Sequence, residues 1–320
     1  MTKVVVIGGS GFIGTHLVRL LLQSGHEVRI VDKNRSEAYP ELSSPCDVRD
    51  RARLESACEG GEVLFNLAAE HRDDVRPISL YDEVNTGGAK NVCEVAEAIG
   101  CERIVFTSSV AVYGFCDSQA DESSETQPFN DYGRTKLDAE RVFRRWVDHG
   151  SGRSLVIVRP TVVFGEGNRG NVYNLLSQIV NGPFLMIGDG ANRKSMAYVE
   201  NVASFLRFSL SFGPGIHIYN YVDKPDYDMN GLVSAVQAHL GRAPKFRLRV
   251  PLWLGYVAGR LLDSLALLLR RPMPLSYVRV QKFVSFSVFS SEKMMTSGFR
   301  PLVPLPEALL RTADHEFGER

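Results

Sequence analysis

Short apolar runs recur along the first half of the chain, and the stretches between them carry apolar residues at helical spacing. The runs that fit buried strands lie at residues 3–7, 27–31, 62–67, 103–107 and 154–158. Residues 17–22 and 89–99 place apolar side chains three or four positions apart, which is typical of one face of a helix. Strands that alternate with helices predict a parallel sheet with right-handed crossovers, and therefore a doubly wound α/β fold.

The alternation weakens beyond Gly165, where glycines, prolines and short helical stretches follow. We therefore expect a first domain over residues 1–165, to which some later segments return. A smaller mixed α/β lobe is expected over residues 166–320. Folds of this kind bind ligands at the carboxyl edge of the sheet, so the lobe is expected to cover that edge and bind the substrate.

One later segment, residues 251–271, is predominantly apolar. On a helical wheel its charged and hydroxyl residues fall in a wedge of roughly 120°. Charges at Arg260 and Asp263 argue against a membrane-spanning helix. Two interpretations remain: a helix buried within the lobe or a dimer interface, or a helix lying in a membrane interface. The basic residues that would favour the second are Lys245, Arg247, Arg249, Arg270, Arg271 and Arg279.

Composition narrows the class of protein. The chain has 320 residues, and its 37 basic and 37 acidic residues balance, so its net charge gives no indication of a nucleic-acid partner. Its five cysteines are odd in number and match no metal-ligand spacing, which favours a reducing compartment and predicts no metal site. The first residues enter a strand directly, without a basic-then-apolar signal segment, so we expect a cytoplasmic protein.

The first strand leads into a helix through glycines at positions 8, 11 and 14. Gly8 permits a tight turn, Gly11 lets the backbone approach a phosphate, and Gly14 lets the helix pack closely on the strand. The helix N-terminus offers N–H groups and partial positive charge to a pyrophosphate. The second strand ends at Asp32, at the expected distance for an acid that binds ribose hydroxyls. These features predict a dinucleotide-binding domain of the Rossmann type.

Two polar positions have alternative interpretations. Asp47 and Val48 follow the expected third strand and can contact an adenine, but Asp47 can equally be a helix N-cap before Arg51. Asn85 lies in a helical pattern and would usually be solvated, although an inward Asn can bind neighbouring backbone groups.

The catalytic candidates are Ser109, Tyr132 and Lys136. Tyr132 and Lys136 are four residues apart, so they share one face of a helix. A cationic lysine, together with the positive charge of a nicotinamide, is expected to lower the tyrosine pKa from about 10 toward neutrality. The phenolate can then remove a hydroxyl proton while hydride leaves the same carbon. Ser109 follows a strand and can hydrogen-bond the same substrate oxygen.

Together these residues resemble the extended short-chain dehydrogenase/reductase family of NAD-dependent epimerases and dehydratases, along nearly the whole chain. In that family's pattern the catalytic set is Ser109, Tyr132 and Lys136. The cofactor-lining positions are Gly8, Gly11, Phe12, Ile13, Gly14, Asp32, Asp47, Val48, Ala68, Lys136 and Pro160. The resemblance implies NAD as cofactor, because the Asp32 carboxylate repels the 2′-phosphate of NADP, a preference that Arg35 slightly opposes.

The reaction within this family is indicated by positions at which the chain differs from the family's dehydratases. Sugar 4,6-dehydratases of this family carry an Asp–Glu pair directly after the catalytic Ser or Thr, where this chain has Val110 and Ala111. Elimination of water therefore lacks its acid and base. A 4-epimerase with transient NADH remains, or a one-way reductase.

Longer blocks, at residues 67–75, 170–175, 194–199 and 219–226, are similar to the N-acetylglucosaminyl-diphospho-undecaprenol 4-epimerases of bacterial surface-polysaccharide (O-antigen) assembly. Nucleotide-sugar epimerases usually have an Arg–Asp pair where Lys194 and Ser195 stand, and an Asn where Val162 stands. Both differences favour a diphosphate that carries a lipid in place of uridine. The resemblance thus implies interconversion of GlcNAc and GalNAc on undecaprenyl diphosphate.

The resemblance also extends to the substrate residues and partners. A charged cluster after a strand is usually a solvated loop, but here it implies contacts to the sugar or diphosphate. The candidates are Glu70, His71, Arg72, Ser109, Asn171, Lys194 and Arg279. A homodimer is implied, and we expect peripheral contact to the cytoplasmic face of the inner membrane.

Three alternatives remain open. Two are enzymes that act on nucleotide sugars: a soluble UDP-GlcNAc or UDP-glucose 4-epimerase, and an NAD(P)H-dependent 4-ketosugar-nucleotide reductase. The third is a dinucleotide-sensing scaffold without activity, against which the intact Tyr132–Lys136 pair argues.

Overall fold

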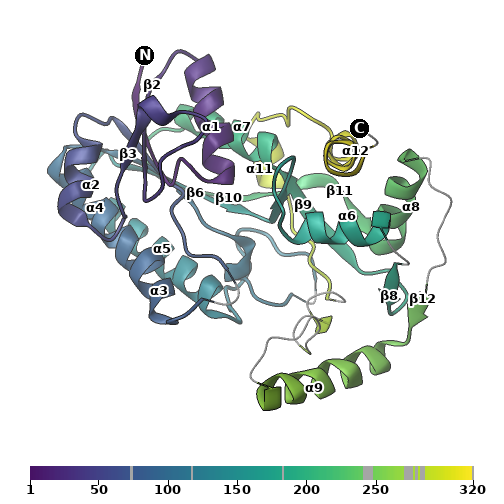
Figure 1. The fold of residues 1–320 in the computed structure, drawn as a ribbon. Coiled ribbons are helices and arrows are strands. Elements are labelled where there is room, and N and C mark those ends of the chain that lie inside the picture. Colours follow the sequence, from purple (N-terminus) through teal and green to yellow (C-terminus); the bar gives the residue numbers. More distant parts are fainter. Residues whose placement is uncertain are drawn as a thin grey trace.

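A seven-stranded parallel sheet forms the centre of the computed structural model, which describes residues 1–72, 75–116, 118–181, 184–240, 248–269, 277, 280–281 and 285–318. The strand order is β10-β6-β5-β4-β1-β2-β3 (Figure 1). The strands are β1 (Lys3–Ile7), β2 (Glu27–Asp32), β3 (Ser43–Pro45), β4 (Val63–Asn66), β5 (Arg103–Thr107), β6 (Ser154–Pro160) and β10 (Gly215–Tyr221). All five strands predicted from apolar runs are confirmed within this sheet.

Helices cover both faces of the sheet, which is why its strands are apolar at consecutive positions. In β1, Val4 and Val6 belong to one buried cluster, whereas Val5 and Ile7 belong to another. The first cluster is covered by α1 (Phe12–Gln23) and α7 (Val199–Phe208), and the second by α2 (Arg51–Cys58), α4 (Gly88–Ala98) and α5 (Asp131–Asp148) (Figure 1). The doubly wound α/β fold is thus confirmed.

Smaller sheets follow β6 along the chain. One has the order β11-β9-β7 and the other pairs β12 with β8 in parallel. Their bounds are β7 (Val162–Phe164), β8 (Leu185–Ile187), β9 (Arg193–Tyr198), β11 (Asp223–Asp228) and β12 (Leu248–Val250). Three helices pack with these strands in a third core cluster: α6 (Asn171–Asn181), α8 (Met229–His239) and α12 (Leu305–Phe317). Strand β10 lies between these segments in sequence but pairs with β6 in the central sheet.

Short elements complete the described chain. They are η1 (Pro40–Leu42), α3 (Ser79–Tyr81), η2 (Asp82–Gly87), η3 (Val110–Val112), η4 (Ser209–Ser211) and α11 (Glu292–Thr296). The π-helical segment η2 continues directly into α4.

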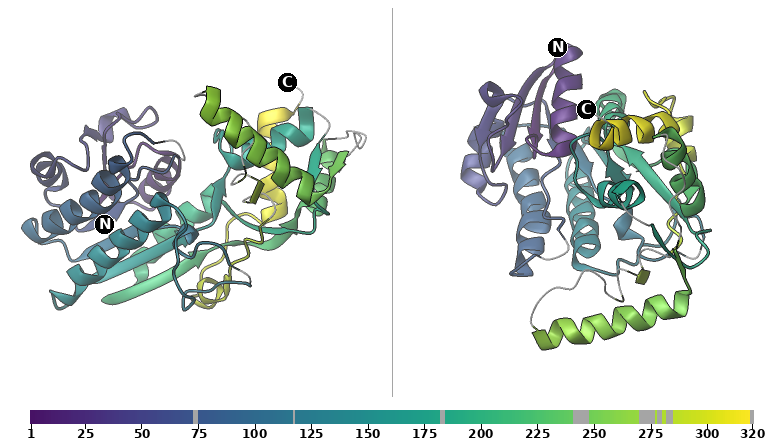
Figure 2. Two further views of the ribbon diagram at one scale, coloured as in Figure 1. Left: turned by 90° about the horizontal axis from the view of Figure 1, so that it is seen from below. Right: turned by 45° about the vertical axis from the view of Figure 1, so that its right-hand side comes forward.

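Helix α9 (Leu252–Leu269) confirms that most of residues 251–271 is helical, and it lies along the outer edge of the molecule (Figures 1 and 2). Gly255 packs on the body of the protein, where an added Cβ would come within 2.8 Å of Ile187. On the opposite side of the helix, Trp253 is 65% exposed and Leu261 66%. Burial of α9 on most sides within the lobe is therefore wrong for the described side chains. Its glycine side meets the body, and Tyr256 and Asp263 contact Tyr277, but the side that carries Trp253 and Leu261 is exposed.

None of the helices in the described ranges combines the length and apolar character needed to cross a membrane. This agrees with the argument from the charges at positions 260 and 263.

Candidate active site

The turn between β1 and α1 shows the geometry that its glycines predict. Gly8 has φ +83°, and a Cβ there would lie 2.5 Å from the Ala68 nitrogen. A Cβ at Gly14 would lie 2.6 Å from the Gly8 oxygen, so α1 packs directly on the end of the strand. Gly11 is the N-cap of α1. The turn therefore forms a cradle of backbone groups at a helix N-terminus, which fits the pyrophosphate of a dinucleotide.

Two acids border this turn. The Asp32 carboxylate accepts hydrogen bonds from the Ser10 and Asn34 backbone nitrogens, at 3.1 and 3.0 Å, which hold it beside the glycine turn. Asp47 binds the Arg49 guanidinium at 2.8 Å, and this interaction lowers the pKa of Asp47. The N-cap of α2 is Asp50, whose carboxylate accepts from the Arg53 nitrogen. The alternative interpretation of Asp47 as the N-cap is therefore wrong.

One cavity of about 1360 Å³ brings together nearly all of the predicted site residues. Ligand cavities are usually about 300–1,000 Å³, so this one has room for a cofactor and a substrate together. It is lined by Gly8, Gly11, Phe12, Ile13, Gly14, Asp32, Asp47, Val48, Glu70, Ala68, His71, Arg72, Ser109, Tyr132, Lys136, Pro160, Asn171 and Lys194. The remaining candidate, Arg279, lies outside the described residues.

The catalytic candidates meet where β5 ends and α5 begins. The Asn130 side chain caps α5 by accepting from the Gly133 nitrogen at 2.9 Å, and this places Tyr132 in the first turn. Lys136 follows one turn later, with only 2% of its surface exposed. Ser109 lies beyond β5, and its side chain hydrogen-bonds Tyr132. The sequence-based set is therefore a spatial cluster on the cavity wall.

Burial dominates the electrostatics of this cluster. Burial raises the pKa of Tyr132, and the hydrogen bond from Ser109 opposes that effect. Burial lowers the pKa of Lys136 to about 7, and the negative charge of Glu140 opposes the lowering. The expected lowering of the Tyr132 pKa is therefore not produced by the protein's own groups, because desolvation of the phenolate outweighs the serine contact.

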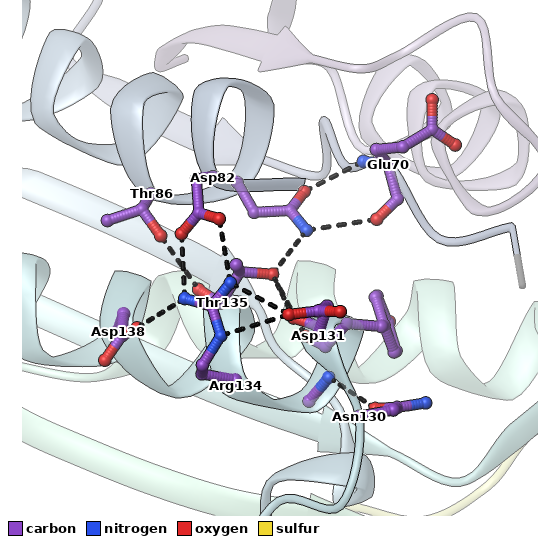
Figure 3. A network of polar contacts seen from close by, with 11 residues as sticks. Glu70, Asp82, Thr86, Asn130, Asp131, Arg134, Thr135 and Asp138 are labelled. Atoms are coloured by element: carbon purple, nitrogen blue, oxygen red, sulfur yellow. Dashed lines mark hydrogen bonds and ion pairs between the residues drawn. The ribbon is translucent and has the colours of Figure 1, made fainter. Parts of the chain in front are cut away.

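Asn85 is only 3% exposed and joins the segments that carry Glu70 and Thr135, both labelled in Figure 3. Its oxygen accepts from the Glu70 nitrogen at 2.8 Å, while its nitrogen donates to the Glu70 carbonyl at 3.0 Å and to Thr135 Oγ1 at 2.9 Å. The interpretation that Asn85 binds backbone groups is thus confirmed. The contacts tie the loop after β4 to η2 and to α5, so Glu70 is held beside the catalytic helix.

Glu70 and Arg72 form an ion pair at 3.0 Å within the cavity wall. The Glu70 side chain is 9% exposed and that of Arg72 63%, and the Arg72 guanidinium lowers the pKa of Glu70. A buried carboxylate therefore holds an exposed cation at the cavity, where the guanidinium can meet an anionic group.

Lys194 supplies a second cation on the cavity wall, from β9. Its Nζ donates to the Ser285 carbonyl at 2.6 Å, and burial lowers its pKa to about 8. Val162 lies on the neighbouring strand β7, and both residues line the cavity. The two positions at which a difference from nucleotide-sugar epimerases is expected thus lie on paired strands of one cavity wall.

Some cavity residues were missed by the sequence analysis. Phe115 and Phe129 stack with ring centroids 4.4 Å apart on the cavity wall, each more than two-fifths exposed. Asn174 and Gln178 extend the amide-bearing face of α6 that begins at Asn171. The spacing of the amides, at i, i+3 and i+7, was a usable signal, whereas the aromatic pair comes from loops with no periodicity.

Among the residues that the structure describes, no group of His, Cys, Asp or Glu side chains is arranged to hold a metal ion.

Comparison with known proteins agrees with this geometry. The sequence profile of the NAD dependent epimerase/dehydratase family matches residues 4–221. An N-acetyl-alpha-D-glucosaminyl-diphospho-ditrans,octacis-undecaprenol 4-epimerase from Escherichia coli O157:H7 is 45% identical over 98% of this chain and 95% of its own length. A UDP-glucose 4-epimerase from Vibrio cholerae is 27% identical over 81% of this chain and 82% of its own length.

A solved structure shows the same fold. The crystal structure of Thermus thermophilus UDP-glucose 4-epimerase in complex with NAD superimposes with a TM-score of 0.77. The two chains are 25% identical, and the superposition covers 99% of each.

Proposed function

The chain belongs to the NAD dependent epimerase/dehydratase family, and on that premise we propose that it is a 4-epimerase acting on a lipid-linked sugar. Its cofactor is NAD. The substrate we propose is N-acetylglucosamine on undecaprenyl diphosphate, interconverted with N-acetylgalactosamine for bacterial surface-polysaccharide assembly. The observation that carries this substrate is the 45% identity, over nearly the full chain, to an enzyme named for that reaction.

The protein's own residues account for the proton transfers of the reaction. NAD would be held by the glycine turn and, when bound, would supply the acceptor and donor of hydride for the sugar C4. Tyr132, as phenolate, removes the proton of the 4-hydroxyl, and as phenol it gives the proton back to the 4-keto oxygen. Ser109 donates to the same oxygen. Lys136 stabilises the phenolate when its amine is protonated and therefore positively charged.

The residues after Ser109 support epimerisation over elimination. Val110 and Ala111 form the first residues of η3 and line the cavity close to the catalytic cluster. Neither has a side chain that can transfer a proton, so a dehydratase step lacks an acid and a base there.

The cations of the cavity support a diphosphate substrate. Arg72 extends from the loop after β4 and Lys194 lies on β9, so anionic groups can be bound from two sides. His71 and Asn171 line the same space and offer hydrogen bonds to a sugar. These substrate roles are part of the proposal.

A peripheral position on the cytoplasmic face of the membrane fits such a substrate, because a polyprenyl chain stays in the bilayer. The exposed apolar side of α9, with Trp253 and Leu261, supports this placement. We also expect a homodimer, as the family resemblance implies.

The test is direct. The purified enzyme is incubated separately with lipid-linked GlcNAc, UDP-GlcNAc and UDP-glucose, and the sugars are identified after release. We expect GalNAc to appear on the lipid-linked substrate without net consumption of NAD(P)H. Tyr132→Phe is expected to lower kcat by about 10²–10⁴-fold, because the proton transfer is lost.

Other outcomes identify the alternatives. Turnover of the UDP-sugars alone would contradict the lipid-linked substrate and favour a soluble epimerase, for which the likeness to the Vibrio cholerae and Thermus thermophilus enzymes is the supporting observation. Steady consumption of NAD(P)H would indicate a reductase. Unchanged activity in Tyr132→Phe would remove the catalytic role altogether.

A further inference from the structure

A buried ion pair lies directly behind the catalytic cluster. Arg159, at the end of β6, donates through Nε to Glu140 Oε1 at 2.8 Å and through Nη2 to Oε2 at 2.6 Å. Their side chains are 2% and 1% exposed. Removing two charges from water is costly, and a buried pair seldom adds net stability over apolar residues of the same size. A role beyond stability is therefore worth testing.

The pair contacts both segments that flank Ser109. Ser108 donates to Glu140 Oε1 at 2.6 Å. Tyr113, which follows η3, accepts from Arg159 Nη1 at 2.7 Å and donates to Asn220 Oδ1 at 2.8 Å. The bidentate contact has one geometry, so the ends of β5 and β6 are held against α5.

Glu140 also follows Lys136 by one helical turn on α5. Residues four apart lie on the same helix face. Lys136 Nζ lies 4.4 Å from the centre of the Phe106 ring, in an apolar environment where an opposite charge acts strongly. The negative charge of Glu140 raises the pKa of Lys136 against the effect of burial.

We propose that Glu140 is a positioning residue: it keeps Lys136 cationic and, through Ser108 and Arg159, fixes the strand ends that carry Ser109 and Pro160 against the catalytic helix. Only the kinetic part of the test below depends on the proposed epimerase reaction. The charged or titratable groups on the elements packed around Lys136 include, toward the cavity and the ion pair, Tyr132 on α5, Tyr113 after η3, Arg159 on β6 and the Glu70–Arg72 pair after β4. The outer face of α5 and η2 add Asp131, Arg134, Asp138, Asp82 and Glu83.

The charge is tested in a variant that keeps the fold. Glu140→Gln alone leaves Arg159 buried without its carboxylate, so it is combined with Arg159→Met, which replaces the pair by uncharged side chains. Folding is checked by thermal unfolding and NAD binding. The Lys136 side chain is then titrated by NMR in the full chain with ¹³C-labelled lysine, with its signal assigned from Lys136→Arg.

We expect Lys136 to lose its proton at lower pH in the double variant than in the wild type. The fall of kcat at alkaline pH should also shift to lower pH in the double variant. At about pH 8, kcat should then decrease by about tenfold for each pH unit of that shift. Tyr113→Phe is the matched control, because it removes hydrogen bonds of the same network and keeps the carboxylate. A folded double variant in which Lys136 titrates as in the wild type would overturn the role of the charge.

The positioning contact is tested separately. Ser108→Ala is expected to lower kcat without moving the Lys136 titration, and Ser108→Thr should restore kcat because its hydroxyl can reach Glu140. An unchanged kcat in Ser108→Ala would overturn the positioning role. The NMR titration uses no sugar, so it stands even if the substrate proposed above is wrong.

Discussion

At the residue scale, burial shifts the proton affinity of the cationic groups around the cavity. The pKa values of Lys136 and Lys194 fall to about 7 and about 8, so both lysines can change charge near neutral pH. Each loses its positive charge as the pH rises through those values. Binding of an anionic substrate and the proton transfer at Tyr132 are therefore both expected to weaken on the alkaline side.

The glycine turn gives the first prediction at this scale. Gly14→Ala is expected to weaken NAD binding by at least about tenfold and to lower the free energy of unfolding, because the new Cβ would lie 2.6 Å from the Gly8 oxygen. Isothermal titration with NAD and chemical unfolding measure the two effects. Gly213→Ala is the control, because an added Cβ there has no atom within 4 Å and, as at Gly14, φ lies outside the left-handed region. Equal NAD binding in both variants would contradict the cradle.

Asp223 gives a prediction on pH and stability. Burial raises its pKa to about 6, against hydrogen bonds from the Tyr198 backbone, Tyr221 and Asn201. The folded state thus favours the protonated carboxyl more than the unfolded state does. Its contribution to stability is complete below about pH 4 and is lost as the pH rises through about 6, by on the order of 2–3 kcal/mol.

Denaturant unfolding at several pH values measures this effect. At each pH the free energy of unfolding of Asp223→Asn is compared with that of the wild type. We expect this difference to favour the variant more at pH 7 than at about pH 4.5, because the wild type loses stability as Asp223 ionises. Asp121→Asn is the control with the opposite sign, because hydrogen bonds from Ser123 lower the pKa of Asp121. A parallel pH dependence in wild type and Asp223→Asn would show that another group is responsible.

At the scale of elements, two helices have faces whose roles differ. On the inner face of α5, Tyr132 and Lys136 line the cavity, and Glu140 forms the buried ion pair with Arg159. Its outer face carries Arg134, which binds Asp82 of η2 at 2.7 Å (Figure 3). In α9 the buried residues are Gly255 and Gly259, whereas Trp253, Val257 and Leu261 are exposed, so its outer side can meet another apolar surface.

The membrane prediction belongs to this scale. Trp253→Asp combined with Leu261→Asp is expected to weaken binding to anionic vesicles by at least about tenfold, because burying each apolar side chain contributes about 1.5–3 kcal/mol. Vesicle cosedimentation measures binding, and NAD affinity should not change. These positions suit the test better than Leu262, whose side chain is half-buried.

Leu302→Asp is the matched control, because Leu302 is 53% exposed elsewhere on the chain. Unchanged vesicle binding of the double variant would contradict a membrane role for α9. Dissociation of a dimer in analytical ultracentrifugation would instead show that α9 contacts a second copy.

At the scale of the whole molecule, the cavity joins the central sheet to the segments that follow β6. Its wall runs from the glycine turn after β1 to α6 and β9. A cofactor in this cavity stabilises the folded state by mass action. In an epimerase the same NAD is reduced and reoxidised within one turnover, so tight retention is more useful than exchange.

NAD is therefore expected to raise the melting temperature by several degrees at a concentration of about 100 times its Kd. NADP is expected to raise it less, because the Asp32 carboxylate repels a 2′-phosphate. Arg35 does not change this expectation, since its Nε donates to the Pro40 carbonyl at 3.2 Å. Differential scanning fluorimetry with both cofactors measures the difference. A shift with NADP as large as that with NAD would contradict the NAD preference.

Much of the fold was predictable because its signals are local. The spacing of apolar residues predicts five strands, the helix at residues 89–99 and the helical character of residues 251–271. The glycines at 8, 11 and 14 predict the turn, because its geometry has no room for larger side chains. A third strand was expected before Asp47 without bounds, since β3 is only three residues long. Strand β10 escaped prediction because its place beside β6 depends on a return of the chain from a distant segment.

The α/β class, the dinucleotide cradle and the shared helix face of Tyr132 and Lys136 were therefore predictable from the chain alone, since each rests on short-range spacing along strands, a turn or a helix. Ser109 was predictable from its place directly after a strand. The folded structure was needed to show which side of α9 is exposed, how burial shifts the pKa values of Tyr132 and Lys136, and that Glu140 pairs with Arg159. Those features depend on desolvation and on contacts between residues far apart in the chain, and neither is visible in a local pattern.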